Sequence, residues 1–213
     1  MVDYDHRGGT VLAIVVSMIF GAVVIVGSLG NALVFLVVLS NRRMRTTTNI
    51  LIANLAVADL LFILFCVPFT ACYYTLSYWP FGDAWCRIVE YLIIVCACAS
   101  VYTLVLMSVD RFLAVVYPLW YTSIRTPANA FGCILLKWII IFVACVPVLV
   151  SYGMVIFDDF HSSCEFRADA GYSFAAFGLS LCMMNFVVPL SLIFVLYALL
   201  LKRLWLGRAP GGR

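Results

Sequence analysis

Charged residues are scarce in this chain. They make up 11% of its 213 residues, against about 25% in a typical soluble domain. Hydrophobic residues make up 66%, against roughly 45–50%. Because water would drive a soluble chain with this much apolar surface to aggregate, we expect an integral membrane protein. The net charge of +3 is small and gives no reason to expect a nucleic-acid partner.

Recognisable catalytic motifs are also missing. The two histidines, His6 and His161, lie outside the apolar runs, and there is no His-Glu-x-x-His motif and no paired intramembrane aspartate. We therefore expect no enzymatic activity and no resident cofactor. Internal repeats and matched broken helices, which are typical of transporters, are absent as well, so a transporter is a remote alternative.

Five long apolar runs are present, and each exceeds the roughly 20 residues that a helix needs to cross a bilayer. They predict spans at residues 10–39, 47–75, 84–116, 127–152 and 172–204. The second should bend near Pro68. Residues 117–126 are expected to be a loop, and the polar segment 154–171 is long enough for a short hairpin. The fold class is an all-α membrane bundle without a domain boundary.

Basic residues gather on one side of these spans. That side carries nine basic residues against Asp110 alone: Arg42, Arg43, Arg45, Arg111, Arg125, Lys202, Arg203, Arg208 and Arg213. Because short loops rich in arginine and lysine stay in the cytoplasm, we expect the C-terminus inside and the N-terminus outside. A multi-pass protein of the plasma membrane fits this pattern.

Four ionisable residues stand out in the apolar runs, where an ionisable side chain costs on the order of +2.5 kcal/mol at a helix centre. Asp59 is deep in the second run, and Asp110-Arg111-Phe112 ends the third. The plain alternatives are a locally hydrogen-bonded aspartate and an arginine that extends to the membrane surface. Lys137, inside the fourth run, either extends to the membrane surface or faces a neighbouring helix, and we assign it no function.

Several motifs follow one another in a characteristic order. They are Gly30-Asn31, Leu55-Ala-Val-Ala-Asp59, Trp79-Pro-Phe-Gly82, Cys86, Asp110-Arg111-Phe112, Pro118-Leu119, Trp138, Pro189 and Tyr197. Together they resemble the first five helices of a rhodopsin-type G-protein-coupled receptor. That family has seven helices, so we expect an incomplete record of a longer receptor or, as an alternative, a truncated form that modulates the full-length receptor.

The resemblance implies roles for particular residues. Cys86 and Cys164, the two cysteines beside polar loop sequence, are the expected disulfide. Coupling to a G protein is expected at Asp110, Arg111, Phe112, Pro118, Leu119 and Tyr197, with Asp110 pairing to Arg111 at rest. A polar pocket that can hold a sodium ion is expected at Asn31, Asp59 and Ser100, whose oxygen atoms suit a hard cation.

The ligand class follows from a missing charge. Amine receptors carry an aspartate eighteen residues before the arginine, where this chain has Ile93. The runs 45–59, 78–82 and 108–118 resemble galanin and allatostatin-A receptors, which implies a neuropeptide ligand and a G protein of the inhibitory class. Candidate peptide contacts are Tyr73, Trp79, Glu90, Ile93, Glu165 and Phe166, because peptides anchor on aromatic side chains. The alternative is that the loop charges are merely solvated.

Overall fold

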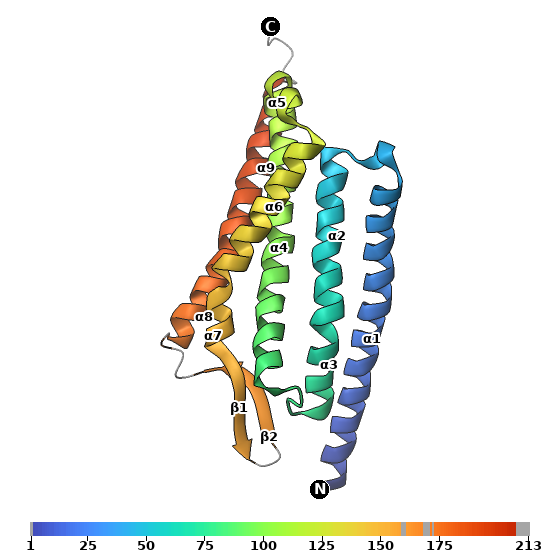
Figure 1. The fold of residues 1–213 in the computed structure, drawn as a ribbon, viewed down its shortest axis with the longest axis vertical. Helices are drawn as coiled ribbons and strands as arrows, with labels where there is room; N and C mark the ends of the chain where they lie inside the picture. The colour runs from blue at the N-terminus through green and yellow to red at the C-terminus, as the bar shows by residue number, and fades with distance from the viewer. Residues whose placement is uncertain (1, 159–160, 168–170, 172, 208–213) are drawn as a thin grey trace.

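Long helices run side by side along one axis and form most of the molecule (Figure 1). The computed structural model describes residues 2–158, 161–167, 171 and 173–207, without the side chains of 2–13, 158, 161, 206 and 207. In this part of the chain, five helices are long and apolar enough to cross a membrane. They cover residues 14–40, 47–76, 82–116, 127–151 and 174–205, which confirms the five expected spans within a few residues at each end.

The helical segments are divided where prolines interrupt the hydrogen-bond ladder. Helix α1 is Val2–Ser40, and a 3-10 turn, η1, covers Arg42–Met44. The second span is α2 (Thr47–Phe65) and α3 (Val67–Leu76), divided at Cys66 beside Pro68, as the sequence predicts. The third is α4, Gly82–Val116. The fourth is α6 (Pro127–Ala144) and α7 (Val146–Ser151), divided beside Pro147. The fifth is α8 (Phe174–Cys182), a π-helical turn η2 (Met183–Val187) and α9 (Val188–Gly207).

The loop expected at residues 117–126 is mostly helical, which corrects the prediction. Helix α5 covers Pro118–Ile124, and proline at its first position suits a helix start because its missing N–H needs no partner there. Leu119 is 93% exposed, so α5 displays an apolar side chain at this end of the bundle. We refer to it as the α5 end.

A β-hairpin covers the opposite end, which we refer to as the hairpin end. Strands β1 (Tyr152–Asp158) and β2 (His161–Phe166) pair antiparallel, so the segment does form the hairpin that its length allows. A disulfide joins Cys164 of β2 to Cys86 near the start of α4, which confirms the expected bond. The hairpin is thereby fixed to the third span.

A second junction holds β1 close to α4. Asp83 Oδ1 accepts a hydrogen bond from the Met154 backbone N–H at 2.9 Å. Gly153 lies so close that a Cβ atom there would be 2.8 Å from Arg167 Cδ and 2.9 Å from Asp83 Oδ1. A side chain at this position would therefore require Arg167 or Asp83 to shift.

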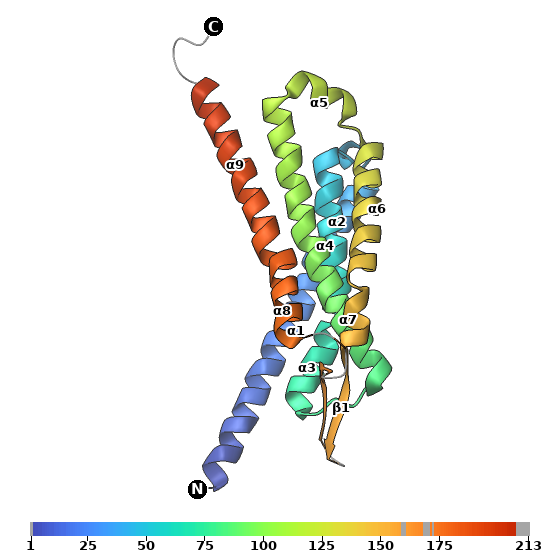
Figure 2. The same ribbon diagram turned by 90° about the vertical axis from the view of Figure 1, so that its left-hand side faces the viewer.

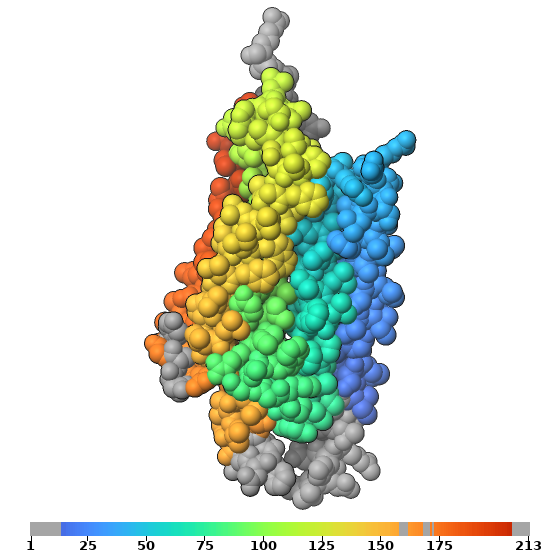
Figure 3. Space-filling view, in the orientation of Figure 1, coloured from blue at the N-terminus to red at the C-terminus, as the bar shows by residue number. Residues whose placement is uncertain are grey.

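Helix α4 is the central element of the bundle and contacts α2, α6, α7, α9 and both strands. Small buried residues such as Ala58 and Ala99, packed with Val95 and Ile141, let the helices approach closely. The side chains of α2 and α6 meet on one face (Figure 3). Helix α9 instead diverges from α4 toward its C-terminal end, which Figure 2 shows from the side.

Candidate functional sites at the two ends of the bundle

Asp110 is the centre of a polar network at the α5 end. Its side chain is buried, and Arg125 binds both of its oxygens, through Nε at 2.8 Å and Nη2 at 2.9 Å. Tyr121 donates its hydroxyl to Oδ1 at 2.9 Å, and Thr48 donates to Oδ2 at 3.0 Å. Such two-pronged, charge-assisted bonds are among the strong ones, so this network connects α2, α4 and the segment around α5.

The expected pairing of Asp110 with Arg111 is wrong for this structure. Within the described residues Asp110 forms its ion pair with Arg125, and Arg111 is exposed. Successive residues on a helix point in directions about 100° apart, so neighbours do not face one another. Asp110 therefore faces α2 and α5, while Arg111 is left open to a partner at this end of the bundle.

Sequence reasoning missed Tyr121 and Arg125. Their spacing of four residues, on a segment that begins with Pro118, was the available signal, because such a pair shares a helix face. Burial and the bond to Asp110 raise the pKa of Tyr121 to about 12. The hydrogen bond to the same carboxylate also raises the pKa of Arg125. The tyrosine thus stays a donor, and the arginine stays charged.

The other residues expected at this end are more open. Phe112 is half-buried, and its ring meets Tyr117 edge-on with centroids 6.5 Å apart. Pro118 begins α5, and Leu119 beside it is the exposed apolar residue noted above. Tyr197 lies on α9 with 46% exposure. These side chains are available to a partner rather than packed into the core.

Two of the three residues expected at the sodium pocket lie together. Ser100 donates its hydroxyl to Asp59 Oδ1 at 3.0 Å, and both are half-buried. Asn31 instead donates its amide nitrogen to Gly27 O of its own helix at 3.0 Å. The Asp59–Ser100 pair offers oxygen atoms of the kind that a hard cation prefers, whereas the Asn31 amide nitrogen is directed to its own helix.

At the hairpin end, Trp79 is a structural residue rather than a free surface. It is 4% exposed, its Nε1 donates to Gly82 O at 2.9 Å, and its ring meets Tyr73 at 6.2 Å and Phe81 at 5.2 Å. Its backbone N–H also donates to Ser162 O of β2 at 2.8 Å. This burial argues against the expected ligand contact, because almost no surface of the indole is left for a peptide.

The remaining candidate contacts are accessible to different degrees. Tyr73 and Ile93 are half-buried and pack against the cluster that holds Trp79. Phe166 is half-buried among Tyr152, Phe174 and Phe177, whereas Glu165 is exposed and accepts a bond from Ser163 at 2.6 Å. Glu90, also half-buried, has no hydrogen bond or ion pair to any described residue. An acidic and aromatic surface therefore surrounds the hairpin end.

Known proteins are similar to this sequence over almost its full length. The family model described as "7 transmembrane receptor (rhodopsin family)" matches residues 30–213. The allatostatin-A receptor of Bombyx mori is 53% identical over 98% of this chain and 60% of its own length. Galanin receptor type 3 of Homo sapiens is 36% identical over 96% of this chain and 56% of its own length. A galanin-like G-protein coupled receptor of Caenorhabditis elegans is 37% identical over 94% of this chain and 48% of its own length. The chain thus spans only about half to three-fifths of these relatives.

Proposed function

Since this chain belongs to the rhodopsin family of seven-transmembrane receptors, we propose that it is part of a neuropeptide receptor of the allatostatin-A and galanin type. The observation that carries the proposal is the 53% identity to the Bombyx mori allatostatin-A receptor over 98% of the chain. The absence of an acidic side chain at Ile93 supports a peptide over a small amine, because a cationic amine would find no counter-charge there.

Peptide binding is assigned to the hairpin end, which we place outside the cell together with the N-terminus. The disulfide and the Asp83 junction hold the hairpin over the bundle, so the loop is ordered before a ligand arrives. Tyr73, Phe166 and Ile93 offer partly exposed apolar surface, and Glu90 and Glu165 offer negative charge. A peptide that combines aromatic and cationic groups matches this surface.

Coupling to a heterotrimeric G protein, of the inhibitory class, is assigned to the α5 end on the cytoplasmic side. Support comes from Arg111, which is exposed, and from the apolar Leu119 and Trp120, which are 93% and 59% exposed. The network around Asp110 fixes the position of α5, so these side chains are presented from one ordered surface. An apolar anchor beside a cation is a common arrangement at protein interfaces.

The test is a completed receptor. Residues 1–213 are joined to the remaining helices of the Bombyx mori relative and expressed in cells, and nucleotide exchange on the G protein is followed with allatostatin-A and galanin peptides. We expect a dose-dependent response to an allatostatin-A peptide and a weaker one to galanin. A correctly folded receptor at the cell surface that gives no nucleotide exchange with either peptide would overturn the proposal.

Arg111→Ala is the decisive variant for coupling. In the completed receptor it should reduce nucleotide exchange by at least tenfold and leave peptide affinity within about threefold, because Arg111 is at the end remote from the hairpin. Arg203→Ala, which removes an exposed arginine from α9, is the matched control. Full exchange by the Arg111 variant would refute its role.

The 213 residues by themselves are expected neither to bind peptide tightly nor to activate a G protein. In the rhodopsin family the sixth and seventh helices form one wall of the ligand cavity. The second candidate role, modulation of a full-length receptor, draws on the broad apolar faces of α1 and α9, where neighbouring helices can pack. Co-expression of the chain with the completed receptor should then lower the maximal response, and an unchanged response would eliminate this role.

A sodium ion at Asp59 and Ser100 is part of the same proposal. When bound, the ion would supply a positive charge to the Asp59 carboxylate inside the bundle. The thermal midpoint of the completed receptor should be higher in sodium than in choline chloride, and Asp59→Asn should remove the difference. An equal midpoint in both salts for the unmodified receptor would contradict sodium binding.

A further inference from the structure

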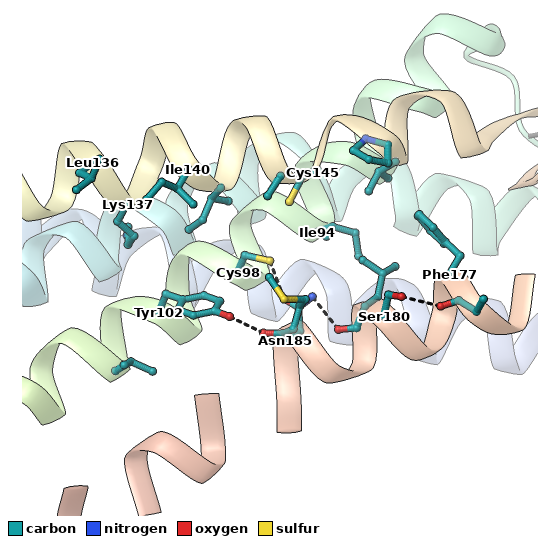
Figure 4. Close-up of a pocket in the computed structure, with 18 of the residues that line it drawn as sticks. Ile94, Cys98, Tyr102, Leu136, Lys137, Ile140, Cys145, Phe177, Ser180 and Asn185 are labelled. Carbon is teal, nitrogen blue, oxygen red and sulfur yellow. Dashed lines mark hydrogen bonds between the residues drawn. The ribbon is translucent and has the colours of Figure 1, made fainter. Parts of the chain in front are cut away.

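An apolar groove lies between α4, the α6–α7 span and α8 (Figure 4). Its volume is about 840 Å³, within the range of ligand sites. Most of its wall is hydrocarbon, from residues such as Ile94, Leu136, Ile140 and Phe177. Lys137 is the one charged residue among the described residues that line it. The described residues that line it come from α4, the α6–α7 span, α8 and η2, together with Gly171 and Ser173.

The Lys137 ammonium is buried at the crossing of α6 and α4. It donates to Ala99 O at 3.2 Å and to Thr103 Oγ1 at 2.9 Å. Thr103 in turn donates to Ala99 O and accepts from Asn54 Nδ2 at 2.7 Å, and Asn54 Oδ1 accepts from Trp138 Nε1 at 2.8 Å. An ammonium has three N–H donors, and these two bonds account for two of them.

This network carries a positive charge that nothing in it balances. The ion pairs in the described part of the chain are Arg87–Asp83 and Arg125–Asp110, and neither involves Lys137. The groups that contact the ammonium are a carbonyl, a hydroxyl and an indole face 4.8 Å away. Such groups solvate a cation without neutralising it. A lone cation inside a membrane is costly and points to a partner of opposite charge.

The depth of Lys137 limits what that partner can be. It lies eleven residues after Thr126, which caps α6, and fourteen before Ser151, which ends α7. At 1.5 Å per residue these distances are about 16 Å and 21 Å. Lys137 is therefore near the middle of a hydrocarbon core of about 30 Å. Phospholipid head groups stay at the surface and do not reach this depth, whereas a small anionic molecule that is soluble in the membrane can reach it.

We propose that this groove binds a long-chain carboxylic acid, with its carboxylate against the Lys137 ammonium and its tail along the apolar wall toward Val148 and Phe177. The carboxylate supplies an acceptor for the third N–H and makes the buried pair neutral. The wall from Lys137 to Val148 extends over eleven residues, about 16 Å, which suits an extended alkyl chain. Burial of each methylene group adds to the affinity.

The 213-residue chain itself is the material for the test. It is placed in nanodiscs of zwitterionic phospholipid and exposed to palmitic acid that carries a photoactivatable group near the end of its tail. Mass spectrometry of the cross-linked peptides should locate the label on α7 and α8. Unlabelled palmitic acid should compete, whereas methyl palmitate, which has the same tail without the charge, should compete at least tenfold less well.

Variants distinguish the contribution of the Lys137 charge to binding from that of the apolar wall. Lys137→Met should weaken competition by unlabelled palmitic acid about thirtyfold or more, as expected when one partner of a buried charge pair is removed. Lys137→Arg keeps the charge and should retain most of the affinity. Ala144→Phe narrows the groove without touching the ammonium and should also reduce labelling. Lys202→Met, which removes an exposed lysine from α9, should change nothing.

Three results would overturn the proposal. One is equal competition by the acid and its methyl ester, which would mean that any lipid tail fills the groove. Another is competition by cholesterol at the same concentration as the acid. The third is labelling of α7 and α8 that the Ala144 variant leaves unchanged. If Lys137→Met fails to fold, the ester comparison and the Ala144 variant still decide the question.

Discussion

Asp110 and Lys137 are both charged residues buried in the bundle, with 2% and 8% exposure, yet their surroundings differ. Asp110 receives an opposite charge and two further hydrogen bonds from residues far away in the sequence. Lys137 receives hydrogen-bond acceptors but no opposite charge from the described residues. The free-energy cost of burying a charge is thus offset by an ion pair at Asp110, whereas hydrogen bonds alone offset it at Lys137.

The difference separates a structural charge from an unsatisfied one. Around Asp110 the neighbours hold the carboxylate in one position, and the exposed Arg111 beside it can act on a partner. Around Lys137 the hydrogen bonds fix the ammonium, but the charge remains to be balanced. Mutations at the two sites should therefore affect stability very differently, and the predictions below are ordered by the size of that effect.

Arg125→Ala should have the largest effect. It leaves a buried carboxylate without its cation, which costs about 3 kcal/mol, the low end of the usual range because a third of the Arg125 side chain is exposed. Thermal unfolding of the purified chain in detergent measures the loss. Arg87→Ala, in the exposed pair with Asp83, is the control and should cost about 1 kcal/mol. Equal losses for the two variants would mean that burial of Asp110 has no special cost.

Tyr121→Phe should cost about 1.5 to 2 kcal/mol, because a hydrogen bond to a charged acceptor is lost. The pKa of Tyr121 is raised to about 12 from 10, so its contribution is complete below about pH 10 and is lost as the pH rises toward 12. Between these pH values, the thermal midpoint should fall more steeply with rising pH for the unmodified chain than for the variant. Tyr117→Phe, at a residue with 54% exposure, is the control.

Lys137→Met should change stability by less than about 1 kcal/mol when no fatty acid is present. The lost hydrogen bonds are offset because an unbalanced charge is also removed, and an apolar residue of similar length replaces it. The same unfolding measurement in lipid-free detergent applies. A loss of 3 kcal/mol or more would show that the charge is balanced in the folded chain and would remove the contrast with Asp110.

Arg111→Ala should have the smallest effect on the stability of the chain, within about 0.5 kcal/mol, because Arg111 is exposed. The residue adjacent to the most sensitive site would then be among the least sensitive. Comparison with Asp110→Asn in the same detergent sharpens the contrast. A large loss for the Arg111 variant would indicate that its guanidinium supports the fold.

Local patterns predicted the elements that local physics controls. Hydropathy located the five spans, because each span is decided by its own residues and the membrane. The bend at Pro68 and the pairing of Cys86 with Cys164 also agree with expectation. The helix at Pro118–Ile124 was missed because it has only seven residues, too few to show a clear helical period, and it lies between two spans where a loop is expected. Its proline start was the signal that could have revealed it.

Partners of side chains could not be predicted in the same way. Asp110 is bound by residues 48, 121 and 125, which the fold brings together across three segments. The family resemblance implied Arg111 instead, a neighbour that points in a different direction on the helix. Trp79 illustrates the same limit, since its sequence position beside the outer loops suggested a ligand contact and its packing against Tyr73 and Phe81 encloses it.

Gly153 determines how low the hairpin can sit on the bundle. Because the space beside its Cα is filled by the side chains of Arg167 and Asp83, any other amino acid there would have to displace one of them. The hydrogen atom in place of a side chain on this residue therefore lets β1 lie close to the start of α4. A change as small as one methyl group would therefore crowd the same Asp83 oxygen that holds the Met154 N–H, and so act on the junction between the hairpin and the third span.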